Sequence, residues 1–479
     1  MTTTYDLVVL GGGAVGEVLA DRAKQGGLSV VVVEHELVGG ECSYWACMPS
    51  KALLRSGMAL RAAKSVAGSA EAVTGGLDVA AVLARRNSFT HDWNDESQVD
   101  WLDGAGIDLV RGHGRLAGVR SVEVTATDGS LITLTATSAV AVITGSEPVI
   151  PDIPGLADAS PWTSRDATAA QSIPESLAII GGGVVACEIA TAYASFGCAV
   201  TMLVRSEILT GTEPFAAELV GSGLAELGVD IRRGRSATAV ERNADGDVVL
   251  TIDDGSTLTA SEVLVATGRS PRTVDIGADS VGLTPGDWLS VDDTLLVQAE
   301  TNQDEPWLYA AGDVNHRALL THQGKYQARA AGDVIAVRAA GGQVHDEPWG
   351  AHVATADHSA VPQVAFTDPE VASVGLTSEA AEKAGYRIRV VDYEIGDVAG
   401  ASLQADGYTG RARAVVDEDR QVLLGVTFVG SDVAEMLQSA TIAVVGEVPL
   451  SRLWHAVPAY PTMSEVWLRL LEVYGRPSA

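Results

Sequence analysis

The strongest constraint on how this chain folds is a pattern of strand, glycine-rich turn, helix and strand that begins near residue 5. An apolar run leads into Gly11-Gly12-Gly13-Ala14-Val15-Gly16, and after a helix-like stretch a second apolar run ends at Glu34. Gly11 permits a tight turn, Gly13 lets the backbone approach a pyrophosphate, and Gly16 lets the helix pack closely on the strand. The amino end of the helix would face the phosphates, and Glu34 could accept hydrogen bonds from a ribose diol. We therefore predict a β–α–β unit that binds a dinucleotide.

The same pattern occurs again over residues 177–205. Its turn reads Gly181-Gly182-Gly183-Val184-Val185-Ala186, so Gly181 and Gly183 repeat the first turn and Ala186 replaces the last glycine. The acid that ends the first copy is missing here, because the second strand ends at Val204 and Arg205 follows. A cation at this place suits a 2′-phosphate better than a bare diol, so we predict a preference for NADPH over NADH. Two such units imply two dinucleotides, and we expect one flavin and one nicotinamide.

Length and charge narrow the class of protein. With 479 residues, the chain is about three times as long as a typical domain of roughly 150 residues. The formal net charge of −30 argues against nucleic acid or an anionic membrane as a partner. The amino terminus has no cationic leader, and no apolar stretch approaches the ~18 residues of a membrane span. Four cysteines are too few for a disulfide-stapled secreted scaffold, so we expect a cytoplasmic protein.

Turn signals predict further elements outside the two units. Asp128-Gly129 and Asp253-Asp254-Gly255 each lie between β-rich stretches, which predicts two hairpins. Residues 87–103 have the composition of a polar helix or lid. Residues 379–385 and 433–445 have helical character, and we expect an antiparallel sheet beside them.

Two cysteines lie close together in the segment Gly39–Lys51, just after the first acid-terminated strand. In a regular helix the Cα atoms of Cys42 and Cys47 would be about 8 Å apart, too far for a disulfide. A bond between them would need a distorted first helical turn, and a strained, accessible disulfide is of the labile, catalytic kind. The helix start and Lys51 nearby would favour a thiolate. From spacing alone, two buried free cysteines remain the alternative.

At this point the chain resembles the pyridine nucleotide-disulfide oxidoreductases of the dihydrolipoamide dehydrogenase, glutathione reductase and mercuric reductase type. The resemblance covers essentially the whole chain and rests on six motifs that occur in order. They are the turn Gly11–Gly16, the segment Cys42–Lys51, the turn Gly181–Ala186, and the runs Ala266–Pro271, Ala310–Val314 and Tyr460–Glu465.

The resemblance implies an α/β fold with two Rossmann-like dinucleotide-binding domains, one for FAD and one for NAD(P), and a C-terminal α+β dimerisation domain. It assigns residues 1–150 and 271–345 to the FAD-binding domain, 151–270 to the NAD(P)H-binding domain and 346–479 to the dimerisation domain. It also implies a homodimer in which the C-terminal segment of one chain completes the active site of its partner.

The resemblance further implies a role for each matching residue. The FAD-binding residues would be Gly11, Gly13, Gly16, Glu34, Gly145, Arg269, Gly312 and Asp313, with Asp313 on the ribityl chain. The NAD(P)H-binding residues would be Gly181, Gly183, Ala186 and Arg205. Cys47 would lie against the isoalloxazine as the charge-transfer thiol, and Cys42 would meet the substrate as the interchange thiol. Lys51 and Glu188 would form an ion pair near flavin N5, and Tyr460 and Glu465 would act across the dimer interface.

This sequence departs from the family pattern around the dithiol. Tyr460 stands where the disulfide reductases carry a catalytic histidine, and a phenol with a pKa near 10 is a poor general base at pH 7. Mercuric reductases have tyrosine there but deliver the metal through a C-terminal cysteine pair, whereas the last cysteine here is Cys198. Glu41 beside Cys42 is expected to disfavour its thiolate, and the rings of Tyr44 and Trp45 are expected to narrow access to the sulfurs.

The sequence thus predicts an FAD-dependent oxidoreductase that passes electrons from NADPH through FAD and a Cys42–Cys47 redox disulfide. The acceptor would be a small disulfide, a thiol-bound compound or another soft electrophile. Three alternatives stay open: a quinone-type reductase that acts at the flavin without the cysteines, a mercuric reductase-like enzyme, and a dihydrolipoamide dehydrogenase-like component of a multienzyme complex. No metal site is predicted.

Overall fold

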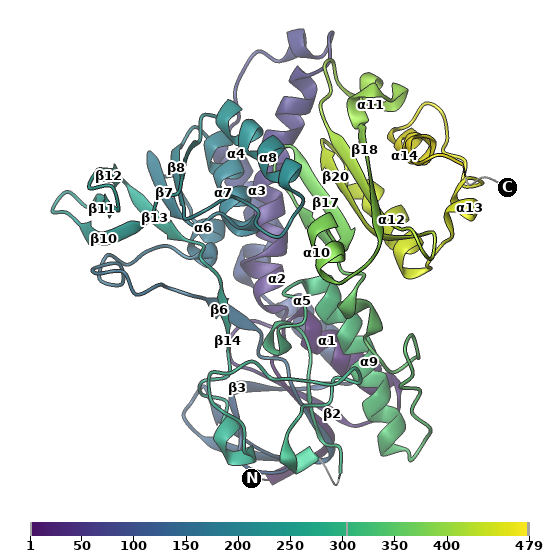
Figure 1. Ribbon diagram of the computed structural model, residues 1–479. Helices are drawn as coiled ribbons and strands as arrows, with labels where there is room; N and C mark the ends of the chain where they lie inside the picture. Colours follow the sequence, from purple (N-terminus) through teal and green to yellow (C-terminus); the bar gives the residue numbers. More distant parts are fainter. Residues whose placement is uncertain (1, 303–304, 477–479) are drawn as a thin grey trace. The chain divides into compact units, whose positions relative to one another are not determined.

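The computed structural model describes residues 2–302 and 305–476, which form two compact units (Figure 1). Each unit is assembled from three separate stretches of the chain, so the chain passes repeatedly from one unit to the other. We call them the first unit (Met1–Pro49, Asn87–Pro148 and Arg269–His358) and the second unit (Ser50–Arg86, Val149–Gly268 and Ser359–Ala479). The division follows packing within the chain, so the assignment of domains to cofactors stays a prediction.

The first unit is built on a twisted sheet whose parallel strands have the order β3-β2-β1-β5-β15. A further strand, β4, pairs antiparallel with both β3 and β5, which confirms the hairpin predicted around Asp128-Gly129. The strands are β1 (Thr2–Leu10), β2 (Val30–Glu34), β3 (Asp108–Leu116), β4 (Ser121–Ala126), β5 (Leu131–Val142) and β15 (Leu308–Ala310). A two-stranded sheet joins β6 (Ser146–Pro148) and β14 (Arg269–Pro271).

Helix α1 (Ala14–Gln25) connects β1 to β2, which confirms the first predicted β–α–β unit. It packs against the long helix α9 (Thr321–Ala339), which lies beside it in Figure 1. Two glycines of α9 allow this close approach: a Cβ on Gly324 would lie 2.6 Å from a methyl of Val15, and one on Gly332 would lie 2.7 Å from Arg22 Cβ. Arg22 and Asp333 join the two helices through two hydrogen bonds of 2.9 Å.

The remaining helices of the first unit are short and flank the sheet. They are α2 (Gly40–Tyr44), α5 (Glu96–Gly104) and the 3₁₀ turns η2 (His91–Trp93), η3 (Ala278–Val281), η4 (Glu300–Asn302), η5 (Asp313–Asn315) and η6 (Thr355–His358). The predicted polar helix or lid at 87–103 is therefore two helices joined by an irregular turn. Helices α3 (Cys47–Lys64) and α4 (Val79–Phe89) each cross a boundary between the units along the chain.

The second unit contains a parallel sheet with strand order β13-β7-β8-β9, which confirms the second predicted β–α–β unit. A separate three-stranded antiparallel sheet contains the hairpin predicted around residues 253–255. The strands are β7 (Ser176–Ile180), β8 (Ala199–Val204), β9 (Asp230–Arg233), β10 (Ala237–Arg242), β11 (Val248–Ile252), β12 (Thr257–Ala260) and β13 (Glu262–Val265), and the helices are α6 (Ser164–Ala169), α7 (Val184–Ser195), α8 (Pro214–Glu226) and the turn η1 (Ala70–Ala72).

The C-terminal part of the second unit is a five-stranded antiparallel sheet of order β16-β17-β20-β19-β18, flanked by helices as predicted. Its strands are β16 (Pro362–Ala365), β17 (Glu370–Gly375), β18 (Ile388–Glu394), β19 (Arg411–Asp417) and β20 (Val422–Gly430). Its helices are α10 (Ser378–Lys383), α11 (Ala399–Gln404), α12 (Leu437–Val445), α13 (Leu450–Leu453) and α14 (Val466–Tyr474), with turns η7 (Ile395–Asp397), η8 (Ala434–Met436) and η9 (Met463–Glu465). A search of the described helices finds none with the length and apolar character that crossing a membrane requires.

Candidate active site

The two cysteines of the first unit meet because the helix between them is broken. Helix α2 ends at Tyr44, the backbone of Trp45 is not helical (φ −136°, ψ −4°), and α3 begins at Cys47. This break brings the two thiols within hydrogen-bonding distance, where a regular helix would hold them apart. The distortion that a bond between Cys42 and Cys47 would need is therefore present.

The Glu41 carboxylate was expected to disfavour the Cys42 thiolate, but in the structure it has a cationic partner. The carboxylate lies 3.0 Å from the Arg272 guanidinium, so its charge is already paired. The pKa of Cys42 is raised, but the causes are the hydrogen bond from Cys47 and burial. Two residues that the motifs did not indicate act in the opposite direction, a hydrogen bond from Thr321 and the charge of Lys325. Thr321 also contacts the second sulfur, with its Oγ1 3.3 Å from Cys47 Sγ.

Tyr44 anchors the redox segment to the rest of the first unit. Its side chain is almost fully buried, its carbonyl accepts a 3.2 Å hydrogen bond from the Trp93 indole, and its ring lies edge-on to that of Trp45. Trp93 belongs to a turn in which three successive residues, His91 to Trp93, have left-handed φ of 48°, 50° and 57°. Tyr44 is therefore a buried packing residue, and narrowing of the access to the sulfurs by its ring and that of Trp45 stays a prediction.

The first glycine turn has the geometry that a dinucleotide needs. Gly11 has φ +107°, and a Cβ there would lie 2.3 Å from the Ile143 carbonyl oxygen. By contrast, a Cβ on Gly13 would have only one neighbour within 4 Å, at 3.9 Å, so this backbone is open to a ligand. The Glu34 carboxylate is held beside the turn, because Oε2 accepts a 2.7 Å hydrogen bond from the Gly12 amide. These residues fit the FAD site predicted for them.

The redox segment starts directly against this turn. The Gly39 amide donates a 2.8 Å hydrogen bond to the Gly12 carbonyl, and the two chains pair at Gly13 and Gly39 as an isolated parallel bridge. A Cβ on Gly40 would lie 2.9 Å from Gly13 Cα. The segment that carries the dithiol therefore packs directly on the predicted FAD turn.

A second group of predicted FAD residues meets around Asp313. Ser146 Oγ donates a 2.5 Å hydrogen bond to Asp313 and lies 2.6 Å from Arg269 Nε, which is itself 3.8 Å from the carboxylate. Gly145 and Gly312 are the immediate chain neighbours of this cluster, and both have positive φ. Ser146 was not predicted, because a serine that follows a glycine carries no distinctive signal by itself.

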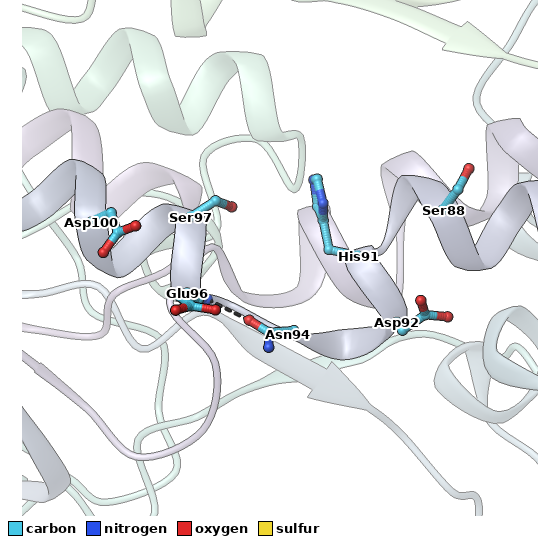
Figure 2. Close-up of a pocket in the computed structure, with 7 residues that line it drawn as sticks. All are labelled: Ser88, His91, Asp92, Asn94, Glu96, Ser97 and Asp100. Atoms are coloured by element: carbon cyan, nitrogen blue, oxygen red, sulfur yellow. Dashed lines mark hydrogen bonds between the residues drawn. The ribbon is translucent and has the colours of Figure 1, made fainter.

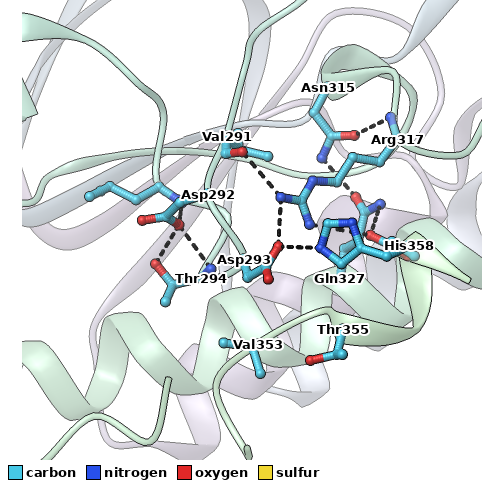
Figure 3. A network of polar contacts seen from close by, with 12 residues as sticks. Val291, Asp292, Asp293, Thr294, Asn315, Arg317, Gln327, Val353, Thr355 and His358 are labelled. Carbon is cyan, nitrogen blue, oxygen red and sulfur yellow. Dashed lines mark hydrogen bonds and ion pairs between the residues drawn. The ribbon is translucent and has the colours of Figure 1, made fainter. Parts of the chain in front are cut away.

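A polar network, part of which Figure 3 shows, supports the turn that carries Asp313. The Gly312 amide donates a 2.8 Å hydrogen bond to Gln327 Oε1, and Gln327 Nε2 donates to Asp357 at 2.8 Å. Figure 3 also shows Asp293 between Arg317 and His358, at 2.9 Å and 2.7 Å. The network fixes the Asp313 turn against α9.

The second unit contains the predicted ion pair. Lys51 Nζ lies 2.8 Å from Glu188 Oε2, and the Glu188 side chain is only 5% exposed. The other Glu188 oxygen accepts a 3.0 Å hydrogen bond from the Phe366 amide, and Lys51 lies over the Phe366 ring at 4.8 Å from its centroid. The buried carboxylate is thus satisfied on both oxygens.

The second glycine turn repeats the first with a more open surface. Gly181 has φ +135°, and a Cβ there would lie 2.2 Å from the Ala266 carbonyl oxygen, whereas a Cβ on Gly183 would have no neighbour within 4 Å. Ala186 is fully buried, and Arg205 is exposed at the end of β8. This geometry fits a second dinucleotide.

The C-terminal pair is not assembled within one chain. Tyr460 is 77% exposed, whereas Glu465 is 7% exposed and bonds to Arg469 at 2.6 Å. Among the described residues, no hydrogen bond joins the Tyr460 and Glu465 side chains. That these two residues act together across a dimer interface stays a prediction.

A separate pocket of about 490 Å³ contains none of the predicted site residues (Figure 2). It is lined by Ser88, His91, Asp92, Asn94, Glu96, Ser97 and Asp100. A search of the described residues finds no cluster of three or more histidine, cysteine, aspartate and glutamate side chains that could hold a metal ion.

Comparison with known families confirms the resemblance seen in the motifs. A family model described as pyridine nucleotide-disulphide oxidoreductase matches residues 5–334, and the dimerisation domain of the same family matches residues 361–470.

Curated relatives and solved structures agree with the family match. A dihydrolipoyl dehydrogenase of Thermus scotoductus is 33% identical, with 96% of this chain and 95% of the relative covered. A mercuric reductase of Staphylococcus aureus is 30% identical, with 96% and 81% covered.

Among solved structures, the HOCl-induced flavoprotein disulfide reductase RclA from Escherichia coli has a TM-score of 0.82 and 23% sequence identity. The match covers 98% of this chain and 100% of RclA. LpdA from Mycobacterium tuberculosis has a TM-score of 0.81 and 23% sequence identity, and the match covers 99% of this chain and 100% of LpdA. These structures show the same α/β fold with a dimerisation domain. The chain belongs to the pyridine nucleotide-disulphide oxidoreductases, and it is an FAD- and NAD(P)H-dependent flavoprotein disulfide reductase of that family.

Proposed function

We propose that this enzyme uses NADPH to reduce a small disulfide, a thiol-bound compound or another soft electrophile through the Cys42–Cys47 dithiol. The observation that carries the proposal is the contact of the two thiols at the break between α2 and α3, in a segment hydrogen-bonded to the first glycine turn. Bound FAD supplies the two-electron step between a nicotinamide and a dithiol. The protein's part is to hold the dithiol at that turn and to control the protons of its two sulfurs.

The proposed residues for FAD are those of the first turn and of the Asp313 cluster. Gly11, Gly13 and Gly16 would admit the pyrophosphate, and Glu34, fixed by the Gly12 amide, would accept from the ribose. The Asp313 carboxylate would accept hydrogen bonds from the ribityl hydroxyls.

The backbone around Asp313 would be shaped by Gly145 and Gly312, which have positive φ. The positive charge beside Asp313 would come from Arg269. Arg269 balances the acid, because its guanidinium lies beside the Ser146 hydroxyl that donates to Asp313.

For the nicotinamide dinucleotide we propose Gly181, Gly183 and Ala186 as the phosphate-binding turn and Arg205 as the 2′-phosphate ligand. One feature supports NADPH over NADH: Arg205 is exposed where an acid would otherwise bind a ribose diol. The Arg235 guanidinium, by contrast, is paired with Asp254 at 2.9 Å.

The ion pair and the C-terminal segment complete the proposal. Lys51 and Glu188 would lie near flavin N5, where hydride arrives from the nicotinamide. Tyr460 and Glu465 would act in a homodimer on the dithiol of the partner chain. The 77% exposure of Tyr460 and 84% exposure of Val457 are what a segment destined for a second copy would have.

The proposed class of substrate follows from the tyrosine at position 460. Reducing a disulfide consumes two electrons and two protons, and the two product thiols take those protons. Position 460 carries a phenol in place of the imidazole that the family's disulfide reductases use, which favours acceptors whose product thiolates leave without an added proton. The alternative, direct reduction of a quinone at the flavin, needs neither sulfur.

The test is an anaerobic titration of the purified flavoprotein with NADPH, followed by absorbance, for the wild type, Cys47→Ser and the matched control Cys198→Ser. We expect a long-wavelength band at two electrons per FAD in the wild type and the control and its loss in Cys47→Ser. Steady-state reduction of 5,5′-dithiobis(2-nitrobenzoate) should fall at least a hundredfold in Cys47→Ser. Retention of that rate, or reduction only of 1,4-naphthoquinone, would favour the quinone alternative.

A further inference from the structure

We propose that Lys325, with Glu17 as its counter-charge, is a positioning residue that stabilises the Cys42 thiolate. The inference rests on the dithiol role proposed above and adds an electrostatic device within the first unit. Neither residue belongs to the six motifs, and both come from the two helices that pack side by side there, α9 and α1.

The amino end of α9 is placed at the sulfurs. Thr321 is its first residue and lies 3.3 Å from Cys47 Sγ. Residues four apart lie on the same face of a helix, so Lys325 follows Thr321 one turn further along the face that meets the dithiol. The positive charge of Lys325 lowers the pKa of the Cys42 thiol, against the effects of Cys47 and burial.

The same turn of α9 is pressed against the first turns of α1. Gly324 precedes Lys325, and a Cβ there would lie 2.6 Å from Val15, two residues before Glu17. One Glu17 oxygen is buried and accepts no hydrogen bond from any described residue. Burial raises the pKa of Glu17 to about 7, and the charge of Lys325 opposes that rise. Glu17 is therefore an acid that ionises near neutral pH beside the cation.

The other charged and titratable groups at this place are accounted for. Cys42 faces Cys47 from α3 and Thr321 and Lys325 from α9, while the carboxylate of its neighbour Glu41 is paired with Arg272. Glu17 faces Lys325 from α9 and acts on the Tyr44 phenol of α2. Lys325 is thus a cation that acts on both the thiol and the acid.

Two consequences can be measured. Removing the Lys325 charge should raise the apparent pKa of Cys42, and one unit of increase slows thiolate chemistry about tenfold at pH 7. Removing the Glu17 charge should leave Lys325 uncompensated above pH 7 only, because below that pH Glu17 is already neutral. Glu17→Gln should then react about two- to threefold faster at pH 8 and equally fast at pH 5.5.

The experiment is carbamidomethylation of Cys42 by iodoacetamide from pH 5.5 to 9, on the FAD-loaded protein reduced anaerobically with NADPH, with each cysteine followed by peptide mass spectrometry. The variants are Lys325→Met, Lys325→Arg, Glu17→Gln and the matched control Arg329→Met, which removes an exposed charge from the same helix. We expect about tenfold slower reaction in Lys325→Met at pH 7, rescue in Lys325→Arg and no change in the control.

The inference is overturned if Lys325→Met and Arg329→Met give the same Cys42 profile, or if Glu17→Gln changes the rate equally at pH 5.5 and pH 8. A second reduction with tris(2-carboxyethyl)phosphine separates this inference from the proposed function. If NADPH fails to free the thiols but the phosphine does, the dithiol role is wrong while the effect of Lys325 on Cys42 is still read out.

Discussion

The two glycine turns share a backbone but differ in what covers them. In the first unit the redox segment covers one side of the turn, with Gly40 packed against Gly13, and the Glu34 carboxylate is fixed by the Gly12 amide. In the second unit the corresponding Val184 and Val185 are 41% and 40% exposed. A covered turn suits a cofactor that stays bound through many cycles, and an exposed one suits a dinucleotide that binds and leaves. The covering segment, rather than the turn itself, distinguishes the two roles.

The largest expected effect comes from exchanging the last residue of each turn. A Cβ on Gly16 would lie 2.0 Å from the Gly11 carbonyl oxygen, so Gly16→Ala should displace the first turn and cost about 3 kcal/mol or more. We expect loss of most bound FAD, measured as the ratio of absorbance at 450 and 280 nm in the purified protein. The reciprocal change, Ala186→Gly, should cost about 1 kcal/mol through helix propensity and leave FAD content unchanged. Full FAD content in Gly16→Ala would remove the distinction between the turns.

The next effect concerns the residue after each second strand. Arg205→Glu gives the second turn the acid of the first, so KM for NADPH should rise about 10- to 100-fold with the loss of a charged phosphate contact. KM for NADH should stay the same or fall. Steady-state kinetics with both nucleotides provides the measurement, and Lys383→Glu, an exposed cation in α10, is the control for net charge. An equal rise for both nucleotides would mean that Arg205 does not read the 2′-phosphate.

The sequence predicts the parts of the site that are local and misses those that depend on distant pairing. The glycine turns and both hairpins follow from neighbouring residues, whereas spacing alone left the arrangement of Cys42 and Cys47 open. The pairing of Glu41 with Arg272 does not follow from neighbouring residues, because it joins residues 231 positions apart, and it gives the carboxylate expected to act on Cys42 a cationic partner. Thr321 and Lys325 were missed for the same reason.

A third comparison contrasts the ion pairs of the two units. Arg22 and Asp333 join α1 to α9 with side chains 38% and 30% exposed, whereas Glu188, paired with Lys51, is 5% exposed. Lys51→Met leaves a buried carboxylate without its cation and should cost about 2 kcal/mol, while Arg22→Met should cost about 1 kcal/mol or less. Urea unfolding measures both. Glu188→Gln added to Lys51→Met should recover part of the loss, and an additive loss would show that the pair is not coupled.

The smallest effect compares two buried acids, Glu17 in the first unit and Glu370 in the second. Burial raises the pKa of each to about 7, but Glu17 faces the cation Lys325, whereas the charges around Glu370 are other acids, Asp432 foremost among them. The pKa of such a carboxyl is higher in the folded than in the unfolded chain, so the folded state binds more protons between about pH 4.5 and about pH 7. The free energy of unfolding therefore falls as the pH rises through that window. Glu370→Gln should therefore raise the free energy of unfolding at pH 8 by on the order of 1 to 2 kcal/mol and leave it unchanged near pH 4. Denaturant melts at the two pH values give the difference.

The gain in the free energy of unfolding from Glu17→Gln should be smaller, since removing that carboxylate also deprives Lys325 of its counter-charge. An equal gain at both positions would mean that Lys325 does not compensate Glu17.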